Sequence, residues 1–130
     1  MEDEDYVSYQ TALALKAAGF SEVTLGKYVD CPKDPVLFSG MIYEPWNLNE
    51  DEILAPSLYD AAKWLRNSEA IDIDIRSTRL TILRYDYMIH DWNKKRISPQ
   101  YYDTYEEALS AAIEDALNLK NEYRKHDDDN

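Results

Sequence analysis

The chain has 130 residues and a formal net charge of −12, from 26 acidic and 14 basic residues. This length predicts one domain, residues 1–130, with loose acidic ends at about residues 1–6 and 126–130. The negative charge disfavours nucleic-acid binding, because phosphate groups would be repelled. The sequence also has no apolar run of the roughly 18 residues that a membrane helix needs, which argues against membrane insertion.

The only cysteine is Cys31, so no internal disulfide can form. A lone cysteine favours a reducing compartment, and the acidic start of the chain is unlike a signal peptide. We therefore expect a soluble, cytoplasmic protein.

The first predicted element is a helix over residues 8–18, capped by Ser8 and ended by Gly19. Its expected core face consists of Tyr9, Leu13 and Ala17. Two strands follow, over residues 23–29 and 36–43, with prolines marking the turn between them. Residues 47–51 read as a surface loop.

A second helix is predicted after Pro56, with Ser57 as its cap and a buried stripe along one side. That stripe consists of Leu58, Ala61, Ala62 and Leu65. The alternation of isoleucine and aspartate over residues 71–75 then predicts a strand with one apolar face. Ile71, Ile73 and Ile75 are expected to point inward.

Ser77 and Thr78 are predicted to form a turn that leads into a long strand over residues 80–92. The expected core face of this strand consists of Thr81, Leu83, Tyr85, Tyr87 and Ile89. A polar turn at residues 93–95 and a short return strand from Arg96 to Ser98 should follow.

The closing helix starts with a capping box from Thr104 to Glu107. Its buried stripe consists of Tyr105, Leu109, Ala112, Ile113, Ala116 and Leu117. The expected fold class is α+β, with three helices and one antiparallel sheet of four to five strands. The expected element order is α-β-β-α-β-β-(β)-α.

Two stretches carry a resemblance to a known family. Residues 55–66, APSLYDAAKWLR, resemble an A-P-T-L-Y-E-A-x-K-W-L-R run in small uncharacterised proteins of gut Bacteroidetes and their phages. The closing helix from residue 102 to Leu117 and the opening from Tyr6 to Phe20 are also similar to that family. The resemblance implies a compact domain of bacterial or phage origin, and it supplies no activity and no catalytic residues.

Candidate chemistry is sparse. A Cys31–His90 nucleophile pair would need the fold to bring the two residues together, and no local signature surrounds either. Oxygen and nitrogen donors for a divalent ion could gather on the wet face of the sheet. These weak metal candidates are Asp72, Asp74, Asp86 and His90, and ion pairs with nearby arginines are the simpler interpretation. The sequence thus predicts no cofactor.

Aromatic residues are the more suggestive signal, because exposed Trp and Tyr often anchor protein interfaces. The candidates are Trp46, Trp92, Tyr101 and Tyr102. Lys94, Lys95 and Arg96 lie near three of them, and such a basic–aromatic group could stack on single-stranded nucleic acid. Tyrosines and tryptophans that edge the core with their polar tips in water are the plainer interpretation.

Three functional hypotheses follow. The first is a non-enzymatic accessory or interaction protein whose partner is another protein, with homo-oligomer formation left open. The second is an acidic mimic of nucleic acid that inhibits a DNA-binding protein, with carboxylates spaced like phosphates. The third is a small metal-dependent enzyme that uses the strand carboxylates.

Overall fold

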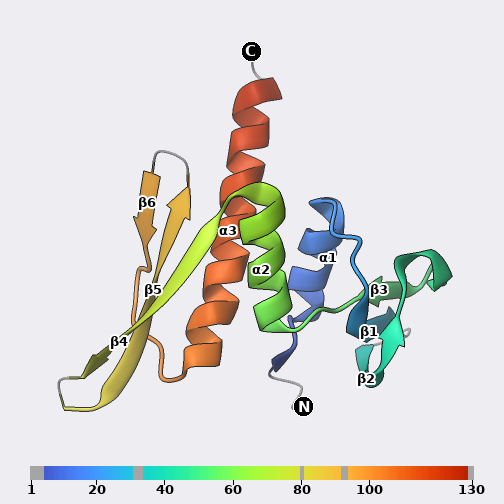
Figure 1. The fold of residues 1–130 in the computed structure, drawn as a ribbon, viewed down its shortest axis with the longest axis horizontal. Helices are drawn as coiled ribbons and strands as arrows, with labels where there is room; N and C mark the ends of the chain where they lie inside the picture. The colour runs from blue at the N-terminus through green and yellow to red at the C-terminus, as the bar shows by residue number, and fades with distance from the viewer. Residues whose placement is uncertain (1–4, 31–33, 80, 92–93, 129–130) are drawn as a thin grey trace. The chain divides into compact units, whose positions relative to one another are not determined.

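A computed structural model describes residues 5–30, 34–79, 81–91 and 94–128 (Figure 1). The side chains of residue 121 and of residues 123–128 lie outside this description. The chain divides into two compact units, residues 1–61 and 62–130. The single-domain expectation, which rests on length alone, stays a prediction.

The described residues form three α-helices and two three-stranded antiparallel sheets, so the fold class is α+β. The expected single sheet of four to five strands is wrong, because six strands divide between two separate sheets. No helix in the described part of the chain is long and apolar enough to cross a membrane.

In the first unit, helix α1 (Tyr9–Ala17) begins and ends as the sequence predicts. The Ser8 hydroxyl accepts a hydrogen bond from the Thr11 N–H. At the other end, Gly19 has a φ of 102°, and the N–H groups of Gly19 and Phe20 donate to the carbonyls of Lys16 and Leu15. This is the Schellman arrangement, which needs a left-handed residue that glycine adopts without strain.

The predicted core face of α1 is wrong. Leu13 and Ala17 are exposed, while the buried side chains are those of Thr11, Ala12 and Leu15. Alternating Ala and Leu offer several apolar stripes of similar strength, so the sequence pattern alone does not select the buried one.

The first sheet has the order β2-β1-β3, formed by β1 (Thr24–Asp30), β2 (Pro35–Tyr43) and β3 (Glu52–Leu54). Strands β1 and β2 match their predicted ranges to within a residue. A short 3₁₀ helix, η2 (Pro45–Asn47), follows β2. The sequence does not predict strand β3. The predicted loop at residues 47–51 begins at the last residue of η2 and ends just before β3.

Gly26 lies where the chain must come unusually close to itself. A Cβ atom there would lie 2.7 Å from the Tyr6 ring and 2.8 Å from the Ala55 carbonyl oxygen. Tyr6 is buried and forms an isolated antiparallel bridge with Ser57. Tyr6, which we expect to lie in a loose N-terminal end, is therefore part of the core of the first unit.

The division between the units falls inside helix α2 (Leu58–Glu69). The Ser57 hydroxyl accepts from the Asp60 N–H, which confirms the predicted cap. At the far end, Ala70 has a φ of 56° and the Ile71 N–H donates to the Leu65 carbonyl. An alanine here holds the left-handed conformation in which glycine is usually found.

The second sheet has the order β4-β5-β6, formed by β4 (Asp72–Arg79), β5 (Leu83–Asp91) and β6 (Lys94–Ile97). The predicted turn at Ser77 and Thr78 is wrong, because both residues pair with β5. The predicted polar turn at residues 93–95 is also displaced, since Lys94 and Lys95 already belong to β6.

Helix α3 (Tyr105–Asp128) lies along this sheet (Figure 1). The Thr104 hydroxyl accepts from the Glu107 N–H, as the capping box predicts. Most of the predicted stripe is buried, together with Ala108, although Tyr105 is partly exposed. The helix also continues to Asp128, through part of the stretch that we expect to be a loose end. Ile71, just before β4, is buried, while Ile73 and Ile75 are half-buried.

The predicted core face of the long strand is only partly correct. Tyr87 and Ile89 are buried and Tyr85 is half-buried, but Leu83 is exposed. Thr81 is also exposed and lies before β5, which begins at Leu83.

Ala70→Gly is expected to raise the free energy of unfolding by about 0.5–1 kcal/mol, because relief of left-handed strain exceeds the entropy that glycine adds to the unfolded chain. Ala17→Gly, at an exposed helical position, is the matched control and should lower it by about 0.5–1 kcal/mol. Urea unfolding monitored by circular dichroism measures both. Destabilisation by Ala70→Gly would show that the Ala70 backbone is not left-handed.

Candidate interaction surface

Exposed apolar side chains gather on and around strand β2 of the first unit. The exposed fractions are 44% for Val36, 48% for Phe38, 67% for Met41, 69% for Ile42 and 71% for Trp46. Strand β2 itself contains no charged residue. We call this set, Val36, Phe38, Met41, Ile42 and Trp46, the β2 surface.

A break in the β1–β2 ladder exposes part of this surface. The strands pair residue by residue from Asp30–Pro35 to Gly26–Ser39, and the next pair is Thr24–Tyr43. Strand β2 therefore has two more residues than β1 across this interval. Gly40, with a φ of 95°, supplies the left-handed conformation that such an irregularity requires. Met41 and Ile42 follow it.

The outer edge of β2 has no neighbour among the described strands, because β2 stands at the end of the order β2-β1-β3. Alternate residues of an edge strand direct backbone N–H and C=O groups away from their partner strand. An exposed apolar edge strand of nine residues is unusual, because proteins commonly protect such edges with charges or prolines. Here Pro35 occupies only the first position.

Acidic residues flank the ladder of β1 and β2 at both ends. Asp30 and Asp34 lie at one end, while Glu22 and Glu44 lie at the other. Residues 1–61 contain 12 acidic and three basic residues, for a net charge of −9, whereas residues 62–130 contain 14 and 11, for a net charge of −3. Most of the negative charge thus belongs to the unit that carries the β2 surface.

Lys27 is the one cation within β1 and β2, and its charge is already compensated. Its ammonium group is paired with Glu52 of β3 and lies 4.8 Å from the centre of the Tyr43 ring. Glu52 also accepts a hydrogen bond from the Asn49 N–H. The Lys27 hydrogen bond and then the Asn49 hydrogen bond lower the pKa of Glu52 from its ordinary value. This pair fastens β3 to β1.

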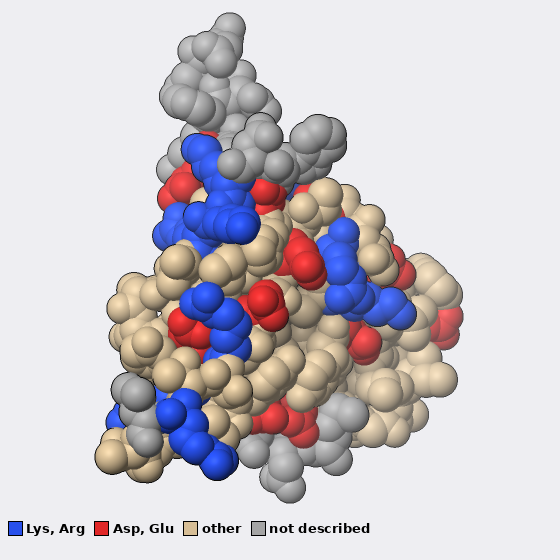
Figure 2. Space-filling model, turned by 60° about the vertical axis from the view of Figure 1, so that its left-hand side comes forward, with Lys and Arg blue, Asp and Glu red and all other residues tan. Residues whose placement is uncertain are grey.

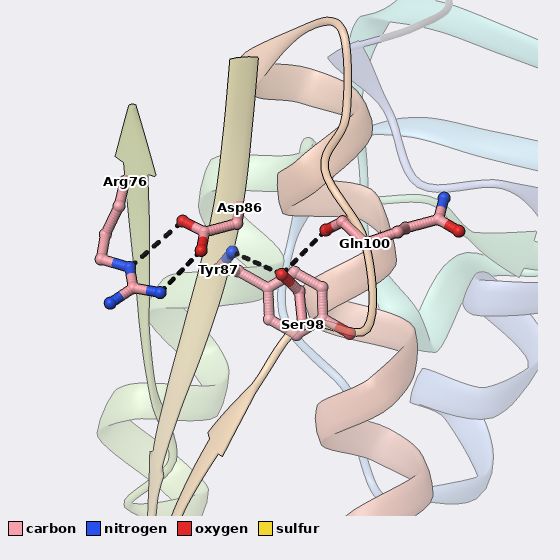
Figure 3. Close-up of polar contacts among 5 residues, drawn as sticks. All are labelled: Arg76, Asp86, Tyr87, Ser98 and Gln100. Atoms are coloured by element: carbon pink, nitrogen blue, oxygen red, sulfur yellow. Dashed lines mark hydrogen bonds and ion pairs between the residues drawn. The ribbon is translucent and has the colours of Figure 1, made fainter. Parts of the chain in front are cut away.

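The metal candidates of the second unit share one face of the β4–β5 ladder, as expected. Asp72 is opposite His90, and Arg76 is opposite Asp86. The Arg76 guanidinium donates to both oxygens of Asp86, at 3.1 and 2.6 Å (Figure 3). In the described part of the chain, no three His, Cys, Asp or Glu residues come together as a metal site would need. The arrangement is thus a cross-strand ion pair.

On the opposite face of the sheet, Asp115 of α3 joins two side chains of the sheet. The Tyr87 hydroxyl donates to Asp115 at 2.7 Å, and the Arg96 guanidinium contacts both Asp115 oxygens at 3.0 and 2.9 Å. Burial, followed by this hydrogen bond, raises the pKa of Tyr87 above its ordinary value of 10. Through these contacts Asp115 binds α3 to the sheet.

The segment after β6 returns along the edge of β5. The Ser98 N–H donates to the Tyr87 carbonyl, the Tyr87 N–H donates to the Ser98 hydroxyl, and that hydroxyl donates to the Gln100 carbonyl (Figure 3). Tyr102 then exchanges two backbone hydrogen bonds with Tyr85 and stacks on the Tyr87 ring. Both edges of β5 are therefore paired along much of its length.

The predicted aromatic anchors have different surroundings. Trp46 and Tyr101 are exposed, whereas Tyr102 is half-buried on Tyr87, and burial raises its pKa. Trp92 and Cys31 lie outside the described residues. The basic–aromatic group does not form one surface, because Lys95 points to the opposite face of β6 from Lys94 and Arg96.

Acidic side chains on the face shown in Figure 2 are interspersed with lysines and arginines. They do not form a continuous strip there, which counts against the regular phosphate-like spacing that a nucleic-acid mimic needs.

The sequence predicts Trp46 as a candidate anchor, and this residue is exposed, but the sequence analysis does not single out β2 as an exposed surface. The signal was present in the run VLFSGMIY, which is apolar on both faces and lacks the alternation of a half-buried strand. Such a run fits either a fully buried central strand or an exposed edge. Only the strand order β2-β1-β3 decides between them.

Comparison with known protein families, with characterised proteins and with solved structures finds no match.

Tyr87→Phe should change the alkaline stability of the protein. A phenol with a raised folded pKa contributes stability that is complete below pH 10 and is lost as the pH rises above it. We expect the variant to be about 1.5 kcal/mol less stable than wild type near pH 8, because the bond to Asp115 is lost. The difference in the free energy of unfolding between wild type and Tyr87→Phe should shrink by roughly 1.4 kcal/mol near pH 11.

Urea unfolding at the two pH values measures this gap. Tyr101→Phe is the control for loss of one hydroxyl group from an exposed ring. A gap between Tyr87→Phe and wild type that stays constant or widens with pH would contradict the assignment of a neutral, buried phenol.

Proposed function

We propose that this chain is a non-enzymatic interaction protein that binds another protein through the β2 surface. The observation that carries the proposal is an uncharged edge strand whose large apolar side chains are exposed in a unit of net charge −9. Contiguous exposed apolar side chains with a polar rim are typical of protein-binding surfaces. Trp46, which is highly exposed close to β2 in the chain, is the residue type that most often dominates binding energy.

The two alternatives have less support. The candidate metal carboxylate Asp86 is engaged by Arg76 on both of its oxygens, which leaves little capacity for an ion. A nucleic-acid mimic would gain from the charge of the first unit. However, a nucleic-acid mimic does not need an exposed, uncharged apolar strand such as β2.

The cellular setting is part of the proposal. The lone cysteine supports a cytoplasmic location. The resemblance of residues 55–66 to small Bacteroidetes and phage proteins supports a bacterial or phage origin.

The proposal predicts that Phe38→Ser combined with Ile42→Ser abolishes co-purification of the partner from extracts of the source cells. The reason is that both side chains are exposed and would be buried only in the complex. The matched control is Ile82→Ser combined with Ile97→Ser, two equally exposed isoleucines of the second unit. Thermal unfolding checks that both variants stay folded, since exposed positions contribute little stability.

Quantitative mass spectrometry of the captured proteins gives the readout. The wild type and the second-unit control should capture the same partner in stoichiometric amounts, and the β2 variant should capture at least tenfold less. Equal capture by the β2 variant would contradict the proposal, as would the absence of any stoichiometric partner of the wild type.

A further inference from the structure

We infer that the partner supplies an extended segment with basic residues at both ends, which adds to the outer edge of β2 as a fourth strand. This inference rests on the proposed function and specifies the chemistry of the partner. It combines three observations on β2: an open backbone edge, exposed apolar side chains on one face, and acidic residues at both ends of the strand.

The open edge supplies the backbone part of the recognition. Strand β2 has nine residues, which span about 30 Å at roughly 3.3 Å per residue. Only Pro35, at the first position, lacks an N–H group. Strand addition to an exposed edge derives its affinity from backbone hydrogen bonds and its specificity from pockets for alternate side chains. The regular stretch from Pro35 to Ser39, where pairing with β1 is continuous, is the natural place for that ladder.

The side chains select an apolar sequence. Val36 and Phe38 lie two residues apart and therefore point to the same face of β2. Leu37, between them, points to the opposite face and is half-buried. A partner strand with apolar residues at alternate positions would place them beside Val36 and Phe38. Met41 and Ile42, after the irregularity at Gly40, extend the apolar contact beyond the regular ladder.

The charges favour a basic segment over a second copy of this chain as the occupant. In an antiparallel pair of β2 strands, the end with Asp34 would lie beside the end with Glu44 of the other copy. In a parallel pair, each acidic end would lie beside its equivalent. Both arrangements bring like charges together without a described cation to compensate them, because Lys27 is already paired with Glu52. A segment with Lys or Arg at its ends turns this repulsion into attraction.

The probe is a synthetic peptide, Lys-Lys-Val-Thr-Val-Thr-Val-Thr-Val-Lys-Lys, titrated onto the full chain by fluorescence anisotropy. Two control peptides isolate the parts of the inference. One has Glu in place of every Lys, which reverses the charge at its ends. The other has methyl groups on the backbone nitrogens of Val and Thr, which removes the hydrogen-bond donors and keeps the side chains.

Two protein variants complete the design. Asp34→Lys with Glu44→Lys reverses the acidic ends of β2, and Asp72→Lys with Asp74→Lys makes the same change in net charge on exposed residues of β4. We expect the lysine peptide to bind wild type and the β4 variant within twofold of one another. The β2 variant should bind at least tenfold more weakly, and the two control peptides should not bind measurably.

Three results would overturn the inference: no binding of the lysine peptide, equal binding of the methylated peptide, or equal binding by the two charge variants. Analytical ultracentrifugation of wild type adds a fourth, because a stable dimer that the peptide does not dissociate would make a second copy the occupant. If the peptide fails while the Phe38 and Ile42 variant still loses its cellular partner, the proposed function stands and only the strand-addition mode falls.

Discussion

Among the strands that the structure describes, β2 has a neighbour along one edge only, and none of its nine residues carries a charge that would keep other strands away. An unpaired edge of this kind is a template for association, because its free N–H and C=O groups can pair with any extended chain. Two local features limit that tendency. Gly40 interrupts the regular ladder, and acidic residues flank both ends of β2, which in our proposal favours a basic segment over a second copy of the chain.

In the second unit, by contrast, the central strand is paired along both of its edges. Its central strand β5 is paired with β4 on one edge and with β6 and Tyr102 on the other. Two of its ion pairs also act within this unit, because Arg76 pairs with Asp86 across the β4–β5 ladder and Arg96 of β6 pairs with Asp115 of α3. These pairs hold the sheet together and attach α3 to it. The proposed binding surface belongs to the first unit, where the edge strand β2 has no such partner among the described strands.

Much of the local structure could be predicted because it depends on neighbouring residues. The caps at Ser8, Ser57 and Thr104 and the stop at Gly19 are set by hydrogen bonds within a single turn. The two-residue alternation identified Tyr87 and Ile89 as buried residues of β5, but it also placed the exposed Thr81 and Leu83 in the same row. Ala70 gave no such signal, because nothing in its sequence neighbourhood marks an alanine for a left-handed conformation.

The features that the sequence did not predict depend on pairing between strands that are distant in the chain. Strand β3 has only three residues, too few to show alternation, and it exists because it pairs with β1 and because Glu52 binds Lys27. The division into two sheets reflects a choice of strand partners, for which the sequence pattern carries no information. The exposure of β2 has the same origin, since an apolar strand is buried or exposed according to which strands flank it.

Amide hydrogen exchange of the full chain, with and without the lysine-ended peptide, tests the central claim most directly. If β2 is an open edge that accepts a strand, the amides between Val36 and Tyr43 that point away from β1 should exchange fast in the free protein and at least tenfold more slowly with saturating peptide, while β6 amides stay unchanged. Protection of these outward-pointing amides in the free protein, or protection by peptide confined to the second sheet, would contradict the account.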